Sequence, residues 1–518
     1  MMAGVVSRFP ASESSSVGKF WLAKDSVEPD DNVKSGGACR IEDGQVEVDV
    51  AGEFTTGMIE VSSGVSVQQP ESKSFDVHGS IPIAPWYVSF LDCVTKSRRR
   101  NGLSLFTKES VPRHLVRGVW AVVGAHVVAG DRYQGVRVRL SGLEEWARTP
   151  GLEQTITKGE SLGSAVVFSA QPQVVTPFGL FGESGSLVVD TVANMDAIDV
   201  HGGQIRRWNR IGLTDLGGWT LEETFLFFVL PMKTLMTLLS GQEAKVLSVE
   251  VQMEDQWFEV FGRYVDGGAR DAKPGTVPMM LGADVFTLER VVTWLAVVHQ
   301  LSPVPNVVAA AIAGEFTTVD TRALVMATSV ESIDRRLRPD HREFDAHVIV
   351  EALEVLRETA IDDGLQKKLL DAVDTYMHEP SMAKRVAELA ENVARVAPDC
   401  VGRTNRWKQA VTGMRIRGAH GLADEGAASP GLNSPHGELD AAQGAEPARN
   451  KAGPDTDANE LVRLHTLALS VQWALRIRVL QACGVPDEDL TAALGTFDEY
   501  TQNRYVWRNY WPRIFDGF

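Results

Sequence analysis

The sequence predicts an α+β multidomain protein, in which a β-rich N-terminal domain with inserted helices precedes an all-α helical bundle. Three observations lead to this prediction. The chain has 518 residues, which is enough for two to four domains at roughly 150 residues each. Its apolar residues follow the period of a strand before about residue 282 and the period of a helix after it. Apolar residues make up 44% of the chain and charged residues 23%, as in ordinary globular proteins.

The N-terminal domain is expected at residues 18–282, after a flexible N-terminus at residues 1–17. Turn residues separate short stretches in which apolar and polar side chains alternate, as in a strand with one buried face. Residues 120–128 are almost continuously apolar, which indicates a strand buried on both faces. A helix is expected at residues 221–239. Other strands are expected at residues 45–50, 87–94, 135–140, 166–168, 187–190 and 246–251.

Beyond residue 282 the apolar residues recur every three or four positions, as in amphipathic helices. We expect a helical connector at residues 283–319 and a helical bundle at residues 320–518, with short loops that favour antiparallel neighbours. Residues 423–459 are rich in Ala, Gly, Pro, Ser and acidic residues, so they bury too little apolar area to fold and predict a disordered acidic loop. Helices are expected at residues 286–301, 321–337, 344–359, 365–377, 382–396, 404–420, 460–483 and 487–500.

Charge and cysteine content exclude several functional classes. The net charge is −17, so the average field of the protein repels phosphate and any nucleic-acid site must be a local basic patch. The four cysteines lie far apart in the sequence, which favours neither a disulfide framework nor a structural zinc site. We predict no metal and no cofactor. The sequence shows no apolar signal region and no run of 18 apolar residues, so we expect a cytoplasmic protein that neither is secreted nor spans a membrane.

One segment, residues 399–422, concentrates positive charge in this acidic chain. On an ideal helix Trp407, Val411 and Met414 share one face, which we expect to pack into the bundle. Gly421 is placed to end the helix, so that His420 lies in the last turn, where the helix dipole favours a protonated imidazole. The basic residues of the segment are Arg403, Arg406, Lys408, Arg415 and Arg417.

An arginine and a histidine supply what metal-free RNA cleavage requires. The guanidinium of Arg415 offsets the charge that builds on the phosphorane, and the imidazole of His420 moves a proton to or from the ribose oxygens. The two residues are about 140° apart on one helix. A symmetric dimer that brings two copies of the motif together would supply both the acid and the base. The simpler alternative is a solvated basic helix face with a histidine at its end.

The motif Arg415-Ile-Arg-Gly-Ala-His420 resembles the R-x4-H motif of HEPN-domain ribonucleases. The upstream region resembles the N-terminal domain of the ApeA-like family of bacterial antiphage proteins, and the order of a β-rich front and a HEPN back matches that family. The upstream motifs are Gly18-Lys-Phe-Trp-Leu22, His78-Gly79, Phe90-Leu-Asp-Cys93, Val123-Gly-Ala-His126 and Leu143-x-x-Trp146.

This resemblance implies a metal-independent endoribonuclease of abortive-infection type that dimerises through its HEPN helices, with Arg415 and His420 as the catalytic positions. It implies a structured RNA such as transfer RNA as the substrate and a phage-derived trigger sensed by the N-terminal domain. We expect Arg403, Arg406, Lys408 and Arg417 to bind RNA phosphates. HEPN ribonucleases commonly carry a polar residue after the Arg, whereas this chain has Ile416. The alternative is therefore a noncatalytic HEPN protein that binds RNA or a phage component.

Three other signals have structural explanations as well as functional ones. Gly182-Glu-Ser-Gly-Ser186 is similar to the nucleophile segment of chymotrypsin-like proteases, but Glu and Ser replace two positions of that segment and a Gly/Ser turn between strands explains it more simply. His78 and His126 suit metal ligation or a hydrogen-bonded structural role. The C-terminal aromatic residues, among them Trp507 and Trp511, suit base stacking or packing of the chain end.

Overall fold

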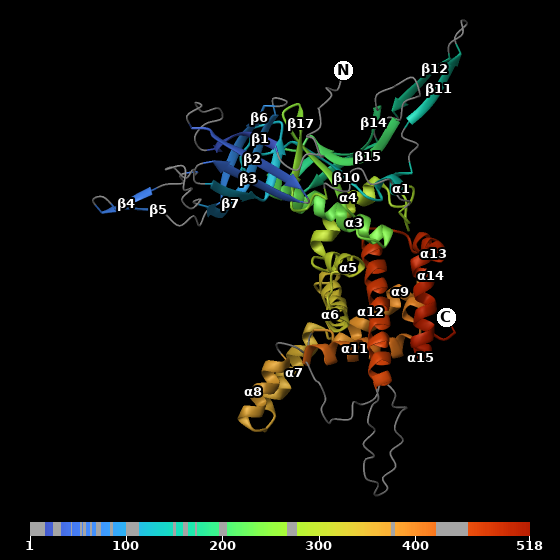
Figure 1. Ribbon diagram of the computed structural model, residues 1–518. Helices are drawn as coiled ribbons and strands as arrows, with labels where there is room; N and C mark the ends of the chain where they lie inside the picture. Colours follow the sequence, from blue (N-terminus) through green and yellow to red (C-terminus); the bar gives the residue numbers. More distant parts are fainter. Residues whose placement is uncertain are drawn as a thin grey trace. The chain divides into compact units, whose positions relative to one another are not determined.

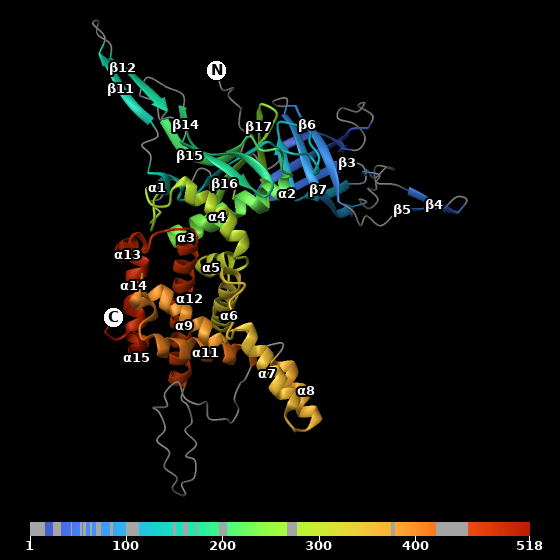
Figure 2. The same cartoon turned by 180° about the vertical axis from the view of Figure 1, so that it is seen from behind.

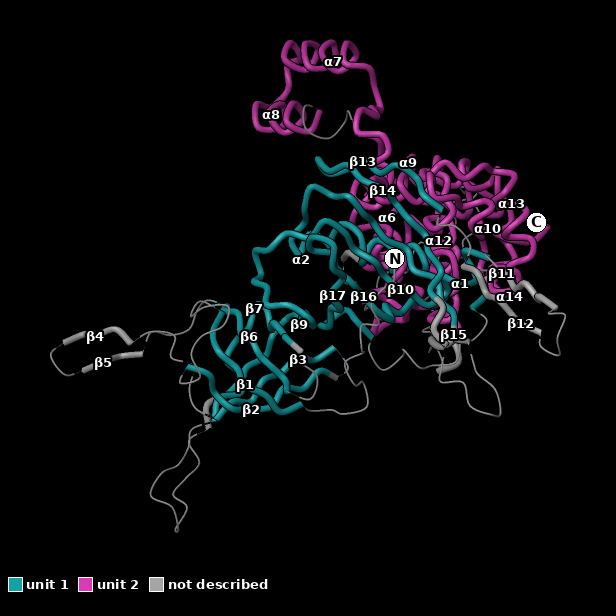
Figure 3. The backbone as a smooth tube through the Cα atoms, turned by 90° about the horizontal axis from the view of Figure 1, so that it is seen from above, with its two compact units in different colours: residues 1–236, 244–278 teal, residues 237–243, 279–518 magenta. Residues whose placement is uncertain are grey.

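The computed structural model divides the chain into two compact units (Figures 1 and 3). Unit 1 comprises residues 1–236 and 244–278, and unit 2 comprises residues 237–243 and 279–518. The structure describes residues 16–23, 33–42, 44–51, 54, 58–62, 65–68, 74–82, 86–99, 113–148, 152–158, 164–170, 174–195, 205–266, 277–373, 379–420 and 454–517.

Six antiparallel strands of unit 1 form a closed barrel. They follow the order β7-β6-β1-β2-β3-β8, and pairing between β8 and β7 closes the ring. Closure leaves no unpaired edge among these strands, because every one of them has two neighbours. Their bounds are β1 (Ser16–Leu22), β2 (Ser35–Glu42), β3 (Gln45–Ala51), β6 (Phe75–Ile81), β7 (Trp86–Arg99) and β8 (Arg113–Gly118).

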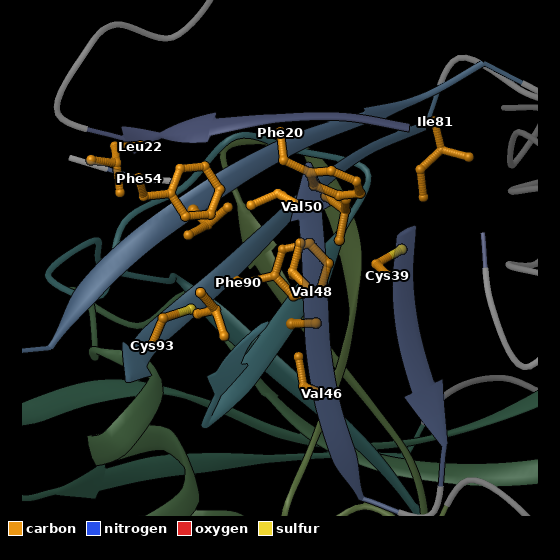
Figure 4. Packing of buried hydrophobic residues seen from close by; sticks show 14 of the residues in the cluster. Phe20, Leu22, Cys39, Val46, Val48, Val50, Phe54, Ile81, Phe90 and Cys93 are labelled. Carbon is orange, nitrogen blue, oxygen red and sulfur yellow. The ribbon is translucent and has the colours of Figure 1, made fainter. Parts of the chain in front are cut away.

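The barrel interior is filled by the inward side chains of alternating positions. In β3 the residues Val46, Val48 and Val50 are fully buried, whereas the intervening positions are more exposed. Phe20 of β1 and Phe90 of β7 meet in the same core with ring centroids 6.1 Å apart (Figure 4). Since successive side chains of a strand point to opposite faces, the alternation in the sequence fixes which residues line the barrel.

A long antiparallel sheet continues from the barrel. β9 begins one residue after β8 and is not a barrel strand; it pairs with β7 on one side and with β17 on the other. From β9 the strand order is β9-β17-β16-β10-β15-β14-β13. Two separate hairpins, β4–β5 and β11–β12, and a short helix complete this part of unit 1. The bounds are β4 (Met58–Ser62), β5 (Val65–Gln68), β9 (Trp120–Val123), β10 (Gly135–Leu140), α1 (Leu143–Ala147), β11 (Leu152–Lys158), β12 (Ser164–Ala170), β13 (Val174–Leu180), β14 (Glu183–Met195), β15 (Ile205–Thr214), β16 (Val246–Met253) and β17 (Gln256–Gly262).

A continuous helical stretch, predicted at residues 221–239, is present as α2 (Leu221–Thr224), a π-helical turn (Phe225–Val229) and α3 (Leu230–Ser240). Thr220 starts it with a capping box in which Glu223 bonds back to the backbone of Thr220. By length and composition, the bent pair of helices at residues 288–312 could cross a membrane if the two helices are counted as one span. Among the described residues, the helical stretch at residues 221–240 is also long and apolar enough to do so. However, 72% of its apolar window is buried, as in the core helix of a folded domain.

Unit 2 is helical, and α12 lies at its centre. α12 packs against α5, α6, α9 and α14, and its last half is almost entirely buried. Figure 2 shows these helices gathered around α12. The bounds are α4 (Leu288–Gln300), α5 (Val304–Ile312), α6 (Val319–Leu337), α7 (Ala346–Glu358), α8 (Asp363–Ala372), α9 (Met382–Ala394), α10 (Pro398–Val401), α11 (Thr404–His420), α12 (Pro454–Ala482), α13 (Asp487–Thr496), α14 (Asp498–Tyr510) and α15 (Pro512–Phe515).

The β-rich N-terminal part and the helical C-terminal part agree with the predicted α+β class, and several boundaries differ. Residues 283–319 are not a separate connector, because α5 packs on α6 and α12 within unit 2. The strand predicted at residues 120–128 ends at Val123, because Gly124 adopts a positive φ of 108° and turns the chain. Residues 16 and 17 belong to β1, and residues 454–459 belong to α12. The rest of the predicted flexible N-terminus and acidic loop lies outside the described residues.

Candidate functional site on helix α11

Helix α11 is fixed in unit 2 by the face that the sequence predicts. Trp407, Val411 and Met414 are buried. The Nε1 of Trp407 donates to the Oγ of Ser470 in α12 at 2.8 Å, and that hydroxyl donates to the carbonyl oxygen of Cys400 at 2.7 Å. A buried indole whose N–H is satisfied in this way holds the helix at a defined rotation. The remaining faces of α11 are thereby turned away from the core.

Arg415 lies at the edge of α11 that faces α6. Its Nη2 donates to the Oε2 of Glu331 at 3.0 Å, and the two side chains are 38% and 21% exposed. Glu331 also pairs with Arg335 one turn further along α6, at 3.0 Å. Arg335 in turn reaches Glu379 at 2.6 Å. The guanidinium of Arg415 is therefore anchored within its own chain while part of it still reaches solvent.

The other predicted phosphate ligands do not gather around Arg415. Lys408 is seven positions before Arg415 and shares its edge, whereas Arg406 and Arg417 lie about half a turn away on the opposite edge. Their contacts agree, since the Nη1 of Arg406 donates to the carbonyl oxygen of Arg513 at 2.9 Å and Arg417 pairs with Glu460 of α12. Arg403, just before α11, is exposed. The basic residues thus form two edges rather than one surface.

His420 is the last residue of α11. Its side chain lies outside the described residues, as does the segment that follows it. The predicted apposition of His420 with Arg415, within one copy or across two, is therefore still a prediction. Ile416 projects toward solvent and is 49% exposed.

A buried network of ion pairs connects α6 and α9. The Nη1 of Arg385 donates to the Oδ2 of Asp334 at 2.6 Å, and their side chains are only 4% and 7% exposed. Arg338 bridges Asp334 and Glu388. Beside them a cavity of about 20 Å³ is large enough for one or two water molecules. In such a buried network each charge is compensated by its partners, so the loss of one side chain leaves an uncompensated charge in the interior. The network therefore stabilises the contact between α6 and α9.

Asp334, His341 and Glu388 also place their ligand atoms within 4.8 Å of one another, as metal ligands do. A divalent cation there would have to compete with two guanidiniums, because Arg338 and Arg385 already hold the carboxylates. Carboxylates engaged by arginines are poor metal ligands, since a bound ion must displace those charge-assisted hydrogen bonds. The arrangement therefore suits an ion-pair network better than a metal centre.

Several residues of the predicted upstream motifs meet on the outer face of the barrel. Trp21, His78 and Ser89 are register partners in β1, β6 and β7, and the loop after β9 covers them. The rings of His78 and His126 stack with centroids 4.8 Å apart, and Trp21 meets His126 edge-on at 5.1 Å. The Nε2 of His78 donates to the carbonyl oxygen of Val127 at 3.0 Å. Burial lowers the pKa of His78, which keeps its ring neutral and suits a structural role.

The remaining sequence signals also have structural explanations. The segment around Ser184 is a hairpin in which Phe181 and Gly182 both adopt positive φ between β13 and β14, as in a two-residue type I′ turn. Trp507 and Phe515 are buried with stacked rings, and the Nε1 of Trp511 donates to the carbonyl oxygen of Arg463 at 2.8 Å. These aromatic residues pack the chain end onto unit 2.

Sequence reasoning missed Glu331. The spacing of Glu331 and Arg335 is a readable helical pair, but nothing in the sequence shows that Arg415, 84 positions away, shares that carboxylate. Comparison with family models, curated proteins and solved structures finds no match to this chain. The functional assignment accordingly depends on the chain's own residues and on the resemblance of their motifs.

Proposed function

We propose that this protein is a metal-independent HEPN endoribonuclease that acts as a homodimer, with Arg415 and His420 as its catalytic residues. The observation that carries the proposal is the position of Arg415, whose partly exposed guanidinium is held by Glu331 little more than one helical turn before His420. A guanidinium has five N–H donors, so its bond to Glu331 leaves others for a phosphate.

The proposed reaction needs only a proton acceptor, a proton donor and a fixed cation. The imidazole of His420 accepts the proton of a ribose 2′-hydroxyl, and the 2′-oxygen attacks the adjacent phosphorus. The bond from phosphorus to the 5′-oxygen breaks, and the protonated His420 of the second copy gives that oxygen a proton. Arg415 stabilises the extra negative charge on the phosphorane. The products are a 2′,3′-cyclic phosphate and a free 5′-hydroxyl.

Other parts of the proposal come from the resemblance to ApeA-like proteins. They are a role in defence against phage in the cytoplasm, a structured RNA such as transfer RNA as substrate, and a phage-derived trigger. Lys408, on the same edge of α11 as Arg415, would bind a neighbouring phosphate. Arg403, Arg406 and Arg417 would contact more distant phosphates of a structured RNA.

The test is cleavage of total RNA by the purified full chain in EDTA. We expect fragments ending in 2′,3′-cyclic phosphate from the wild type, and a loss of at least 100-fold in rate from Arg415→Ala or His420→Ala. Arg395→Ala is the matched control, because Arg395 is a 62% exposed arginine just after α9 that pairs with Asp487 at 3.7 Å and, within the described part of the chain, with no residue of α11. Full cleavage by either catalytic variant would show that these residues do not perform the chemistry.

The second candidate function is a noncatalytic HEPN protein that binds RNA or a phage component. Two observations favour it: Ile416 is exposed where a polar residue is common, and Glu331 already balances the charge of Arg415. This candidate predicts RNA retention in an electrophoretic shift assay with no fragments at any enzyme concentration. Restoration of cleavage by Ile416→Asn would identify Ile416 as the cause.

A further inference from the structure

Helices α7 and α8 form an antiparallel hairpin, here called the arm, that buries no residue between Ala346 and Ala372 (Figures 1 and 3). The two helices have 13 and 10 residues. Isolated helices shorter than about 12–15 residues are marginal in water, and protein helices owe most of their stability to packing. An arm of this kind needs an additional surface to cover its apolar side chains.

The exposed apolar side chains of the arm lie on one of its sides. On α7 the half-buried Ile349 and Leu356 mark the side toward α8, where Gln366 donates to the carbonyl oxygen of Leu356 at 2.8 Å. Val348 and Val355 lie about a quarter turn from that side and are 39% and 65% exposed. On α8, Leu365 and Leu369 are likewise about a quarter turn from the contact and are 50% and 37% exposed. In both helices the exposed pair precedes the contact residues by one position. Because α8 runs antiparallel to α7, this offset is a rotation in opposite directions about the two axes, so Val348 and Val355 lie on the same side of the arm as Leu365 and Leu369.

We propose that this side, the arm face (Val348, Val355, Leu365 and Leu369), docks onto the arm face of a second copy of this chain. Two stacked helical hairpins form a four-helix bundle, the simplest structure in which such a stripe becomes a core. The interface is then isologous, with the same residues contributed by both copies.

Charge selects the orientation of the two arms. The outer side of α7 carries Glu351, Glu354 and Glu358, whereas the outer side of α8 carries Lys368. The other charged residues of α8, Asp363, Lys367 and Asp371, lie toward the side of the arm away from the arm face. A two-fold axis along the helices places α7 of one copy against α8 of the other, so that the glutamates on the outer edge of α7 lie beside the ammonium group of Lys368. An axis across the helices would instead place α7 against α7 and align carboxylates, which is unfavourable.

The arm joins unit 2 beside the site on α11. Arg335, which pairs with Glu331, also pairs with Glu379 just after the arm, and Lys384 pairs with Glu343 just before it at 3.1 Å. Docked arms would therefore fix the ion pairs that anchor Arg415. This consequence for cleavage rests on the proposed function, whereas the docking itself does not.

The first test is the mass of the full chain by sedimentation velocity without RNA. We expect a dimer for the wild type and at least a tenfold weaker dimer for Val355→Glu. Val350→Glu is the matched control, because Val350 is 53% exposed on the same helix but on the opposite side of the arm. A monomeric wild type at 50 µM, or equal weakening by both variants with unchanged thermal unfolding, would refute the proposal.

The second test is the orientation. All four native cysteines are buried, so cysteines introduced on the arm can be cross-linked selectively. Val355 and Leu365 both lie near the turn of the arm, and we expect Val355→Cys chains to cross-link to Leu365→Cys chains faster than to one another. The opposite preference would exclude the proposed pairing of α7 with α8. Cleavage assays on Val355→Glu, at a concentration where sedimentation shows it to be monomeric, then separate the two proposals: a wild type that dimerises but cleaves no RNA contradicts the proposed function and leaves the docking intact.

Discussion

Replacement of Arg385 by alanine should strongly destabilise the contact between α6 and α9. The side chain is 4% exposed and donates to Asp334 at 2.6 Å, and its Nε donates to the carbonyl oxygen of Pro380 at 3.0 Å. Loss of one partner of a buried ion pair costs about 3–5 kcal/mol. Since Arg338 still pairs with Asp334, we expect the lower end, about 3 kcal/mol, which is roughly a 100-fold increase in the opening equilibrium.

The assay is hydrogen exchange of the intact protein, followed by mass spectrometry on peptides from α6 and α9. Arg335→Ala is the matched control, because this arginine is 52% exposed and pairs with Glu331 and Glu379. A surface pair of this kind contributes at most about 1 kcal/mol. If both variants change exchange equally, burial does not determine the strength of this network. The combination Asp334→Leu with Arg385→Met should recover most of the loss, because it removes both buried charges.

Two further predictions concern unit 1. Gly37→Ala should lower the free energy of unfolding by about 1–3 kcal/mol, because the added Cβ would lie 2.5 Å from the carbonyl oxygen of Asp49. Gly36→Ala is the control, since an added Cβ there has no neighbour within 4 Å. In urea unfolding the control should stay within about 0.5 kcal/mol of the wild type. Because burial lowers the pKa of His78, the unfolded chain binds its proton more readily, and the free energy of unfolding should fall as pH drops below about 6.5. In His78→Gln the free energy of unfolding should depend less steeply on pH between pH 7.5 and 5. An unchanged slope would contradict the lowered pKa of His78 as the cause.

The sequence predicts most helices of unit 2 because their apolar residues repeat with a clear period. It gives no separate bounds for α5 within the predicted helical connector, because this run of Val and Ala shows no polar face and follows the Pro at position 303. It also predicts α7 and α8 as ordinary bundle helices, because an amphipathic pattern does not show whether its apolar face is covered within the same chain. Barrel closure through β7 and β8 was not predicted, since pairing is set by contacts that no local pattern encodes.

The candidate site was likewise predicted only in part. The packed face of α11 follows from the spacing of Trp407, Val411 and Met414, and the structure confirms it. The partners of the basic residues depend on which helices lie beside each edge, and these helices are distant in sequence. Glu331 and Glu460 therefore emerge only from the fold, although they determine how much positive charge Arg415 and Arg417 present to solvent.

Barrel closure has a consequence for solubility. With β7 and β8 paired, the open edge of the main sheet among the described strands is β13, where Val174 and Val175 are 50% and 54% exposed. Exposed apolar edges recruit extended segments of other chains and start aggregates. Pro177 stands in the middle of β13 and carries no N–H donor, so a foreign strand cannot extend an unbroken ladder along it. The imino ring of this one residue limits intermolecular sheet growth where the fold is otherwise open.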